Sequence, residues 1–518
     1  MSHVIAIDAG TGSVRAVLFD AEGRPVTSAA RDWHHDPEPG VPGSMGFAVE
    51  RNYALVVQVL REVLAASPVP AAEISAVSAT SMREGIVVLD AQGRELWACA
   101  NVDARAGEEV AELAAAGDVE KQLYSRSGQT FALAAQPRLR WLARHRPDLY
   151  DQAATVLMLS EWVLYRLCGE LAIEPSNGST SGLLALATRQ GDPDLATLCG
   201  LRDDLLPPVR ESGAPLGTVH RRASADTWLS TDTLVVVGGG DAQMATLGTG
   251  LADAGEAMII AGTFWQQEVN IGQPLTDPQM RVRVNAAAVP GMWQAEAIAF
   301  HAGTAVRWFR DTFAGPEVRA AEQAGRNSLD VLTEAAAEVP VGADGIIPIF
   351  SDVMNYRRWK HAAPSFLNLS LDGGPRLRAA MFRSLLENAA IVADANLAMV
   401  AEFSGTQPEE VVFAGGSAKS KVWAQIVADV VGRPLRVPAV TEATAHGTAA
   451  CAASGAGLYA TPAAAARAWV RWDRTVEPSA KNNEAYASVK DRWRRAYAAQ
   501  RTLMEEGLTV PMWQAPGT

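Results

Sequence analysis

The sequence lacks the features of a secreted protein and of a protein stabilised by disulfides or structural zinc. Its 518 residues include only four cysteines, Cys99, Cys168, Cys199 and Cys451. They form no CxxC pair and no cysteine–histidine cluster. This pattern argues against a disulfide framework or a structural zinc site and favours a reducing compartment. The chain also begins directly with a strand-like run, without the basic region and apolar segment of a signal peptide. We therefore expect a cytoplasmic protein.

Long hydrophobic runs and an excess of positive charge are missing too. Glycine or charged residues interrupt the apolar stretches, whereas a bilayer-spanning helix needs about 20 apolar residues, so we expect no membrane partner. Lys and Arg number 45 against 58 Asp and Glu, a formal charge of −13. An acidic protein repels phosphate backbones, which makes nucleic acid a poor partner. Nucleotides stay possible ligands, because local dipoles and metal ions bind them.

A long internal repeat is the most informative feature that is present. His3–Val26 contains two apolar β-rich runs around a Gly/Thr/Ser turn, followed by a third strand-like run. A similar pattern returns at Met258–Gly272, soon after the strand-like run Val235–Gly240. The period is far longer than the roughly 20–50 residues of solenoid repeats. The repeat therefore predicts two α/β domains with a cleft between them, residues 1–246 and residues 247–518.

The turn Asp8-Ala-Gly-Thr-Gly-Ser13 is a candidate phosphate-binding loop. Gly12 lets backbone N–H groups approach phosphate oxygens, and the hydroxyls of Thr11 and Ser13 add donors. Asp8, at the end of the first strand-like run, could hold Mg²⁺ directly or through water. Taken alone, the motif is equally well interpreted as a tight hairpin capped by Asp8.

Two glycine-containing turns in the second half are candidates for the rest of an ATP site. Gly262 and Thr263 form a turn that matches the first loop in the repeat, so the two loops could hold the β- and γ-phosphates from opposite sides. Gly415, Gly416 and Ser417 follow a strand-like run and precede a helical pattern, which suits a loop that packs against the base and ribose. In isolation each is equally well interpreted as an ordinary turn that needs glycine.

Asp241 ends the run Gly238-Gly-Gly-Asp241 and is the candidate catalytic base. The C-terminal end of an apolar strand is where α/β folds place their chemistry. In phosphoryl transfer to an alcohol, a carboxylate orients the hydroxyl and accepts its proton. Asp241 is also a candidate magnesium ligand together with Asp8. Alternatively, it caps a helix that begins at Ala242.

Several polar residues are candidates for binding the phosphate acceptor. Arg83 and Glu84 follow a strand-like run, and Asn101 and Asp103 belong to a polar cluster in an otherwise apolar region. His301 lies in the apolar run AIAFHAG. The alternatives are a solvated ion pair at Arg83 and Glu84, ordinary loop polarity at the cluster, and a hydrogen-bonded core histidine at position 301.

Together these motifs resemble the FGGY carbohydrate kinases over nearly the whole chain. Asp8–Ser13 is similar to the first phosphate loop of that family, Gly262-Thr263 to the second, Gly415–Ser417 to the adenosine motif, and Gly238–Asp241 to the segment with the catalytic aspartate. The resemblance implies two ribonuclease-H-like domains of the actin/hexokinase type. It implies that they close over ATP, Mg²⁺ and a polyol or sugar.

The sequence departs from the usual pattern of that family at two places, and the second departure and several segments point to a particular acceptor. Arg138 stands where a lysine is usual, and Phe350–Ser365 replaces the stretch typical of pentulose kinases. The chain instead resembles the branch that phosphorylates 4,5-dihydroxy-2,3-pentanedione in five segments: SMREGIVV from Ser81, WACANVDARA from Trp97, GTFWQQ from Gly262, VRWFRDTF from Val306 and HAAPSFLNLS from His361. The resemblance implies phosphorylation of the terminal C5 hydroxyl of the linear, hydrated form.

Other functions stay open at this point. A kinase for another short polyol or ketose, such as erythritol, xylulose or ribulose, would carry the same ATP motifs. A catalytically silent nucleotide-binding sensor would keep the loops and lose the base, and an actin-like filament protein would not need the acceptor-side clusters. A homo-oligomer is possible.

Overall fold

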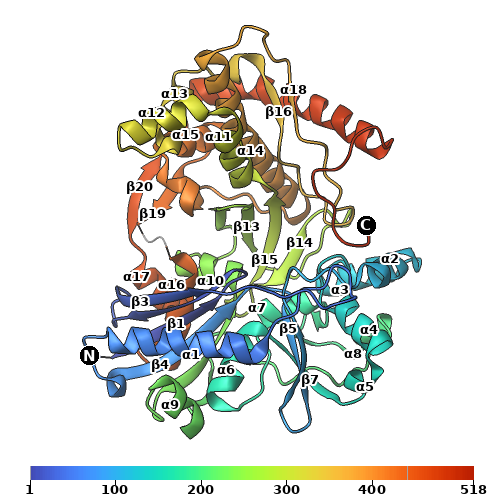
Figure 1. Ribbon diagram of the computed structural model, residues 1–518, viewed down its shortest axis with the longest axis vertical. Helices are drawn as coiled ribbons and strands as arrows, with labels where there is room; N and C mark the ends of the chain where they lie inside the picture. Colours follow the sequence, from blue (N-terminus) through green and yellow to red (C-terminus); the bar gives the residue numbers. More distant parts are fainter. Residues whose placement is uncertain (1, 440–441) are drawn as a thin grey trace.

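Two mixed β-sheets form the centres of two lobes, which are stacked along the long axis of the molecule (Figure 1). The computed structural model describes residues 2–439 and 442–518. The first sheet has the strand order β10-β11-β4-β1-β2-β3. Its strands are β1 (His3–Ala9), β2 (Ser13–Phe19), β3 (Pro25–Asp32), β4 (Ile74–Ser81), β10 (Pro215–Thr218) and β11 (Leu234–Gly240).

The second sheet repeats the central arrangement of the first. Its order is β14-β15-β13-β12-β18-β19-β20, with β12 (Ala257–Ala261), β13 (Trp265–Ile271), β14 (Arg283–Ala286), β15 (Trp293–Ala299), β18 (Val411–Ala414), β19 (Leu435–Pro438) and β20 (Trp472–Val476). In both sheets an antiparallel hairpin, β1–β2 or β12–β13, is followed in space by a parallel strand, β4 or β18. This order confirms the predicted repeat and the two ribonuclease-H-like α/β units.

Alternation along β1 gives the first sheet two apolar faces. Ile5 and Ile7 pack with α1 (Val49–Ala65) and α6 (Leu159–Cys168), whereas Val4 and Ala6 pack with α16 (Ala443–Gly455) on the other face. The helical pattern of α1 agrees with this packing, because its buried apolar residues share one face of the helix: Tyr53, Val56, Val59, Leu60 and Val63. A helix from the second half of the chain therefore completes the core around the first sheet.

Smaller elements surround the two sheets. The short strands are β5 (Ile86–Asp90), β6 (Glu95–Cys99) and β7 (Ala153–Met158) in one sheet, and the pairs β8 (Leu184–Ala185) with β9 (Gln190–Gly191) and β16 (Ile347–Ile349) with β17 (Ser365–Leu367). The first lobe also contains α2 (Gly107–Ala115), α3 (Val119–Ser127), α4 (Gln136–His145), α5 (Pro147–Tyr150), α7 (Pro175–Gly178), α8 (Pro193–Leu198) and α9 (Arg221–Thr227). The later helices are α10 (Asp241–Gly248), α11 (Ala302–Phe313), α12 (Gly315–Gln323), α13 (Ser328–Ala337), α14 (Pro375–Ser404), α15 (Lys421–Val431), α17 (Pro462–Trp469) and α18 (Ala480–Glu505).

Helix α14 corrects the expectation that glycine and charged residues interrupt every long apolar stretch. Among the residues that the structure describes, it is the one helix long and apolar enough to cross a membrane by length and composition, and its most apolar 18-residue window has a mean hydropathy of 1.2. However, 78% of its most apolar window is buried inside the protein, where α14 packs against α11, α15, β13 and β15. The helix is apolar because it forms the core of the second lobe.

Helices α10 and α16 cross closely at the boundary between the lobes (Figure 1). The crossing depends on two glycines: a Cβ on Gly248 would overlap the carbonyl oxygen of Ala443, and a Cβ on Gly447 would overlap that of Met244. The overlapping atoms belong to the backbone, so a rotamer change cannot relieve the clash. The absence of side chains at these positions therefore sets the distance between the two helices.

We predict that Gly447→Ala destabilises the protein. Alanine favours a helix over glycine by about 1 kcal/mol, but overpacking of a rigid contact costs about 1–3 kcal/mol, and here the overlap is with backbone. A fall in the thermal unfolding midpoint should show this. The control is Gly373→Ala, where a Cβ meets no atom within 4 Å and the change should stay within about 0.5 kcal/mol. Equal midpoints for both variants would contradict the packing account.

Candidate active site

Asp241 lies at the junction of β11 and α10, facing the boundary between the lobes. The strand ends at Gly240 and the helix begins at Asp241, whose carboxylate accepts a hydrogen bond from the Ala242 N–H at 2.8 Å. Burial raises the pKa of Asp241, and the positive charge of Arg83, whose Nε is 3.4 Å from Oδ1, opposes that rise. The side chain is still 39% exposed, so an acceptor can reach the carboxylate.

Asp8 places a second carboxylate in the same region. It lies near the end of β1, and its pKa is raised to about 7 by burial and then by the negative charge of Asp241. Two carboxylates that disfavour each other's ionisation form a site that a divalent cation would stabilise. In residues 2–439 and 442–518 there is no group of three or more His, Cys, Asp or Glu side chains that could hold a metal. Two carboxylates suit Mg²⁺, which keeps several waters and takes further oxygens from phosphates.

Hydrogen bonds from Trp33 and Asn101 hold the first candidate phosphate loop, and the tip of the loop is exposed. Trp33 donates from Nε1 to the Gly10 carbonyl at 2.9 Å and from its N–H to the Gly12 carbonyl at 3.1 Å. The amide of Asn101 donates to Thr11 Oγ1 at 3.0 Å. Thr11 and Gly12 are exposed and Ser13 begins β2. Asn101, predicted on the acceptor side, therefore lies against this loop.

The second candidate loop joins β12 to β13 and packs against the start of α11. A Cβ on Gly303 would overlap the Gly262 carbonyl oxygen, and the Gly303 N–H donates to the Thr263 carbonyl at 3.1 Å. Arg307, one turn into α11, donates from Nη2 to Thr263 Oγ1 at 3.1 Å. The sequence-based interpretation missed Arg307. The signal was its position four residues, about one helical turn, after Gly303.

The candidate adenosine loop lies beside the second phosphate loop. Strands β12 and β18 are parallel neighbours, so the turns at their carboxyl ends share one edge of the sheet. Gly415 has φ of 98°, which favours glycine, and a Cβ there would lie 2.8 Å from the Ala261 carbonyl oxygen. Gly416 and Ser417 begin a short 3₁₀ helix. The structure thus brings the predicted second-half ATP residues together at one edge.

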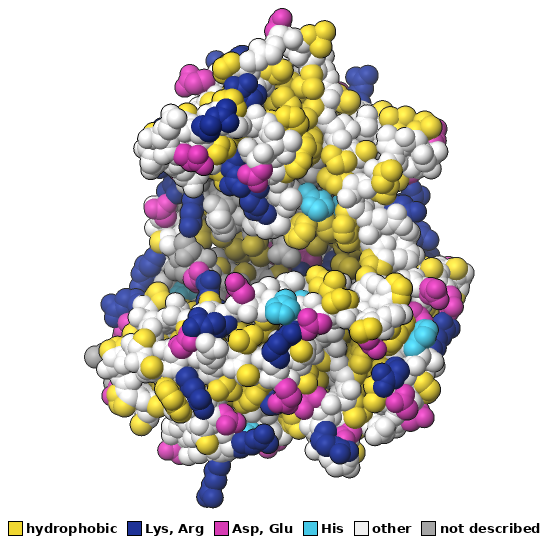
Figure 2. Space-filling model, in the orientation of Figure 1, with side chains coloured by type: hydrophobic (Ala, Val, Ile, Leu, Met, Phe, Trp, Pro, Cys, Tyr) yellow, Lys and Arg dark blue, Asp and Glu magenta, His cyan; other side chains and the backbone are white. Residues whose placement is uncertain are grey.

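Arg83 and Glu84 form ion pairs with the other lobe and are buried, unlike a solvated surface pair. The guanidinium of Arg83 pairs with Glu296 on β15, and its Nη2 lies 3.1 Å from Oε1. Arg283 on β14 pairs with Glu84, with 2.6 Å between Nη1 and Oε1. Both pairs cross from the first half of the chain to the second. Figure 2 shows that the surface is hollowed between the two lobes.

A polar face of the second sheet completes this region and was not predicted. Glu268 on β13 lies directly opposite Glu296, and both are fully buried. Burial and the charge of Glu296 raise the pKa of Glu268. For Glu296, burial acts to raise the pKa, but Arg83 and Arg283 outweigh it and lower the pKa. The sequence signal was the alternation of polar residues in three strands: Glu268 and Asn270, Arg283 and Asn285, Gln294 and Glu296.

Two further predicted residues occupy different surroundings from Arg83 and Glu84. The carboxylate of Asp103 is buried, where it accepts from the Met45 N–H at 2.6 Å and from Arg105 Nε at 2.9 Å. His301 precedes α11 with φ of 59°, and its ring centroid is 5.4 Å from that of Phe264, beside the second phosphate loop. Burial lowers the pKa of His301, so the ring is neutral near pH 7.

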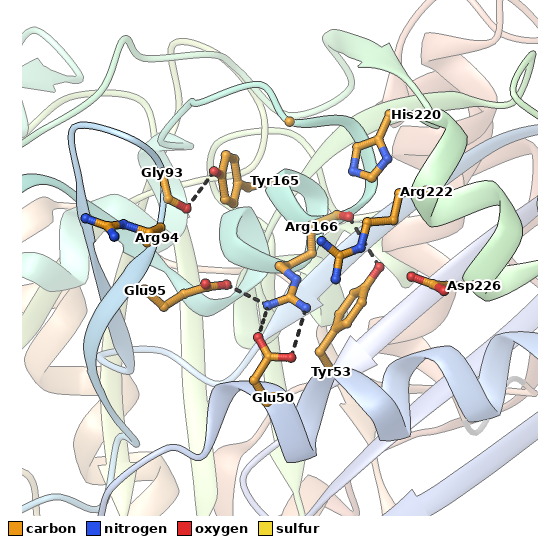
Figure 3. A pocket seen from close by; sticks show the side chains of 11 residues that line it. Glu50, Tyr53, Gly93, Arg94, Glu95, Tyr165, Arg166, His220, Arg222 and Asp226 are labelled. Carbon is orange, nitrogen blue, oxygen red and sulfur yellow. Dashed lines mark hydrogen bonds and ion pairs between the residues drawn. The ribbon is translucent and has the colours of Figure 1, made fainter.

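A separate surface pocket lies elsewhere in the first lobe (Figure 3). It has a volume of about 280 Å³ and is lined by residues of α1, α6, α9 and the β5–β6 turn. Its central cation, Arg166, pairs with Glu50 at 2.8 Å and Glu95 at 2.7 Å and lies over the ring of Tyr53. Because these charges already neutralise one another, we assign the pocket no part in the chemistry.

Comparisons with known proteins agree with this geometry. The family model described as "FGGY family of carbohydrate kinases, N-terminal domain" matches residues 3–248, and the corresponding C-terminal domain model matches residues 257–456. The chain is 49% identical over 517 residues to the autoinducer-2 kinase of Yersinia enterocolitica, covering 99% of this chain and 98% of the relative. It is 49% identical over 519 residues to that of Klebsiella pneumoniae, covering 100% and 98%.

Solved structures show the same fold. The xylulose kinase from Rhodospirillum rubrum superposes with a TM-score of 0.85 at 26% identity, covering 97% of this chain and 100% of the other. The glycerol kinase of Plasmodium falciparum with ADP gives a TM-score of 0.82 at 18% identity, with coverage of 96% and 98%. The chain therefore belongs to the FGGY family of carbohydrate kinases and is an ATP-dependent phosphotransferase.

Proposed function

We propose that this kinase transfers the γ-phosphoryl group of ATP to the C5 hydroxyl of the linear, hydrated form of 4,5-dihydroxy-2,3-pentanedione, the quorum-sensing signal autoinducer-2. The observation that carries the choice of acceptor is the 49% identity, over nearly the full length of both chains, to relatives named autoinducer-2 kinase. The observation that supports catalysis is the carboxylate of Asp241, which is accessible and lies beside a buried guanidinium.

In this proposal Asp241 is the catalytic base. A carboxylate with a raised pKa accepts a proton more readily than an ordinary aspartate, and Arg83 keeps it oriented at 3.4 Å. It would orient the terminal hydroxyl toward the γ-phosphorus and take its proton as the oxygen attacks. A primary hydroxyl suits this step because it crowds the in-line path least. A silent nucleotide-binding sensor would not need an accessible base at this position.

The three glycine-containing turns would bind ATP. Thr11, Gly12 and Ser13 would contact the phosphates from the first lobe, and Gly262 and Thr263 from the second. Gly415, Gly416 and Ser417 would pack against the adenosine. The parallel pairing of β12 and β18 supports this arrangement, because it places the last two turns at one edge.

Asp8 and Asp241 would hold Mg²⁺, whose positive charge neutralises the charge that develops on the transferred phosphoryl group. The raised pKa of Asp8, which the negative charge of Asp241 helps to cause, supports this role. Arg307 would add a fixed positive charge beside Thr263, to which it already donates a hydrogen bond.

The acceptor would be held by Arg83, Glu84, Asn101, Asp103, Asp241 and His301. Guanidinium N–H groups donate to hydroxyl oxygens, and carboxylates accept from hydroxyl hydrogens, so this set matches an acceptor with several adjacent hydroxyl groups. A hydrated dione has such groups on neighbouring carbons. A site built from buried hydrogen-bonding groups rejects analogues that lack them, because its own groups then stay unpaired.

The same proposal includes the organisation and setting of the enzyme. The two kinase domains are residues 1–246 and residues 247–518, with the acceptor and the first phosphate loop on the first domain. The enzyme acts in the cytoplasm on ATP and a small molecule. It has no nucleic acid or membrane as a partner, because its net charge of −13 repels polyanions.

We predict that Asp241→Asn abolishes most turnover and leaves ATP binding nearly intact. The amide keeps the size of the side chain but cannot accept the proton, and loss of a general base costs about 10²–10⁴-fold in kcat. ADP release gives kcat, and titration with ATP gives its Kd. Asp232→Asn, at an exposed position before β11, is the matched control. Wild-type turnover in the Asp241 variant would rule out the base assignment.

We also predict a pH-dependent effect of Asp8→Asn on stability. The folded-state pKa of about 7 exceeds the value of 3.8 for an ordinary aspartate. The ionised Asp8 therefore destabilises metal-free wild type progressively as pH rises from 3.8, and fully above about pH 7. Asp8→Asn should raise the unfolding midpoint more at about pH 8 than at about pH 5.

Added Mg²⁺ should stabilise wild type more than Asp8→Asn, because the ion binds the ionised carboxylate. Asp203→Asn, at an exposed position in the first lobe, should show neither effect. If the difference between Asp8→Asn and wild type were the same at both pH values, Asp8 would not carry the raised pKa.

The acceptor itself is tested by kcat/KM for 4,5-dihydroxy-2,3-pentanedione, erythritol, xylulose and ribulose under identical conditions. We expect the pentanedione to give the highest value, since specificity is the ratio of these constants. A rival that exceeds it by tenfold, about 1.4 kcal/mol in transition-state binding, would refute the acceptor and leave the kinase activity in place.

A further inference from the structure

One arginine outside the predicted site connects three of the predicted acceptor-binding residues. Arg138 lies on α4 and is only 4% exposed. Its guanidinium donates to the backbone carbonyls of Glu84 at 2.6 Å, Asn101 at 2.8 Å and Asp103 at 3.0 Å, through Nη1, Nη2 and Nε respectively. Because the donors of a guanidinium form a rigid planar fork, these contacts fix the three backbone segments relative to one another.

The hydrogen bond from Arg138 to the Glu84 carbonyl holds a residue whose backbone conformation is strained. Glu84 has φ of 62°, in the left-handed region that non-glycine residues rarely occupy. Such a conformation persists only where the surroundings hold it. The Glu84 N–H donates to Thr180 Oγ1 at 3.2 Å, and the Glu84 carbonyl accepts from Arg138. Both peptide groups that flank Glu84 are thus held, one by Thr180 and one by Arg138.

The left-handed turn determines where the Glu84 carboxylate points. It directs the side chain across the lobe boundary to Arg283, 2.6 Å away. The preceding residue, Arg83, reaches Asp241 and Glu296 from the same turn. If the backbone at Glu84 relaxed to an ordinary conformation, the side chains of Arg83 and Glu84 would point in other directions and lose these partners. The conformation at this one residue therefore sets the geometry of the acceptor side.

Arg138 is also an unusual buried cation. Within residues 2–439 and 442–518, Arg138 is in no ion pair, and the carboxylate of Asp103, whose carbonyl it contacts, pairs with Arg105 instead. Backbone carbonyl oxygens supply its hydrogen-bonding partners. A buried charge without an ionic partner is costly for stability. Stability alone therefore does not account for an arginine at this position, whereas its fixed three-way contact does.

We propose that Arg138 is a positioning residue of the acceptor site, which holds Glu84 in its left-handed conformation and sets the positions of Asn101 and Asp103. This inference rests on the proposed acceptor-binding role of those residues. Arg138 acts through them and not by touching the acceptor. The expected signature is a loss of acceptor binding without a comparable loss of ATP binding.

The first experiment compares Arg138→Met with Arg144→Met, the same substitution on the same helix at a side chain that is 39% exposed. Arg138→Met should raise the KM for the acceptor by about tenfold or more, while the KM for ATP stays within about twofold of wild type. Arg144→Met should change neither. Arg138→Lys, with one nitrogen in place of three, should fall between wild type and Arg138→Met. Equal rises in both KM values would overturn the proposal.

A double-mutant cycle tests whether Arg138 acts through Glu84. On a Glu84→Gln background, Arg138→Met should add much less than its own effect on the acceptor KM, because Arg138 acts by positioning the Glu84 carboxylate, which this background already lacks. Fully additive effects would overturn the proposal. If Arg138→Met does not fold, Thr180→Val serves in its place, since it removes the other hydrogen bond that holds Glu84; an unchanged acceptor KM would then count against the proposal.

Hydrogen–deuterium exchange separates this inference from the identity of the acceptor. The kinetic assays use whichever acceptor of the panel wild type phosphorylates best, so failure of the pentanedione does not affect them. In the free enzyme, Arg138→Met should speed exchange in peptides that cover residues 82–105 and leave those of the second lobe unchanged. Unchanged exchange in 82–105 would show that Arg138 does not hold this segment.

Discussion

The buried ion pair between Arg83 and Glu296 is the interaction on which the site depends. Arg83 follows β4 of the first sheet, and Glu296 lies on β15 of the second, so the pair joins the two lobes across their boundary. Neither charge is stable in the interior without the other. The same guanidinium lies 3.4 Å from Asp241. The orientation of the base is therefore coupled to the contact between the lobes.

This coupling explains why a strand face in the second lobe is polar where a sheet normally buries apolar residues. Glu268, Glu296 and Arg283 face residues of the first lobe, and each charge there has an opposite charge nearby. Burial and the negative charge of Glu296 raise the pKa of Glu268, whereas the two arginines lower the pKa of Glu296. The pKa values of the two neighbouring carboxylates are shifted in opposite directions, which limits the electrostatic cost of burying both.

The sequence predicted those parts of the fold and site that depend on local patterns. The hairpins at residues 3–19 and 257–271, the turn at Gly262-Thr263 and the strand that ends before Asp241 all follow from apolar alternation and glycine positions. Arg283, Glu296 and Arg307 were missed, because their importance comes from partners more than 40 residues away or from the other lobe. The polar alternation of the strands and the position of Arg307 in its helix are visible in the sequence, but neither identifies the distant partners.

The sequence also could not predict contacts between segments that are far apart in the chain. Asn101 was predicted on the acceptor side from its polarity, and its hydrogen bond to Thr11 in the phosphate loop was not foreseen. Helix α16 was part of the second half by sequence, yet it packs on the first sheet. Arg138 was noted only as an arginine in place of a lysine, and its three carbonyl contacts became visible when distant segments came together in the fold.

The central claim is that the two lobes together hold an acceptor hydroxyl between Asp241 and the γ-phosphate of ATP. A crystal structure with a non-hydrolysable ATP analogue, Mg²⁺ and the best acceptor tests it directly. The account predicts a terminal hydroxyl within about 3 Å of an Asp241 carboxylate oxygen and in line with the γ-phosphorus. An acceptor bound with its hydroxyls out of reach of Asp241, or on one lobe away from the Arg83–Glu296 pair, would contradict it.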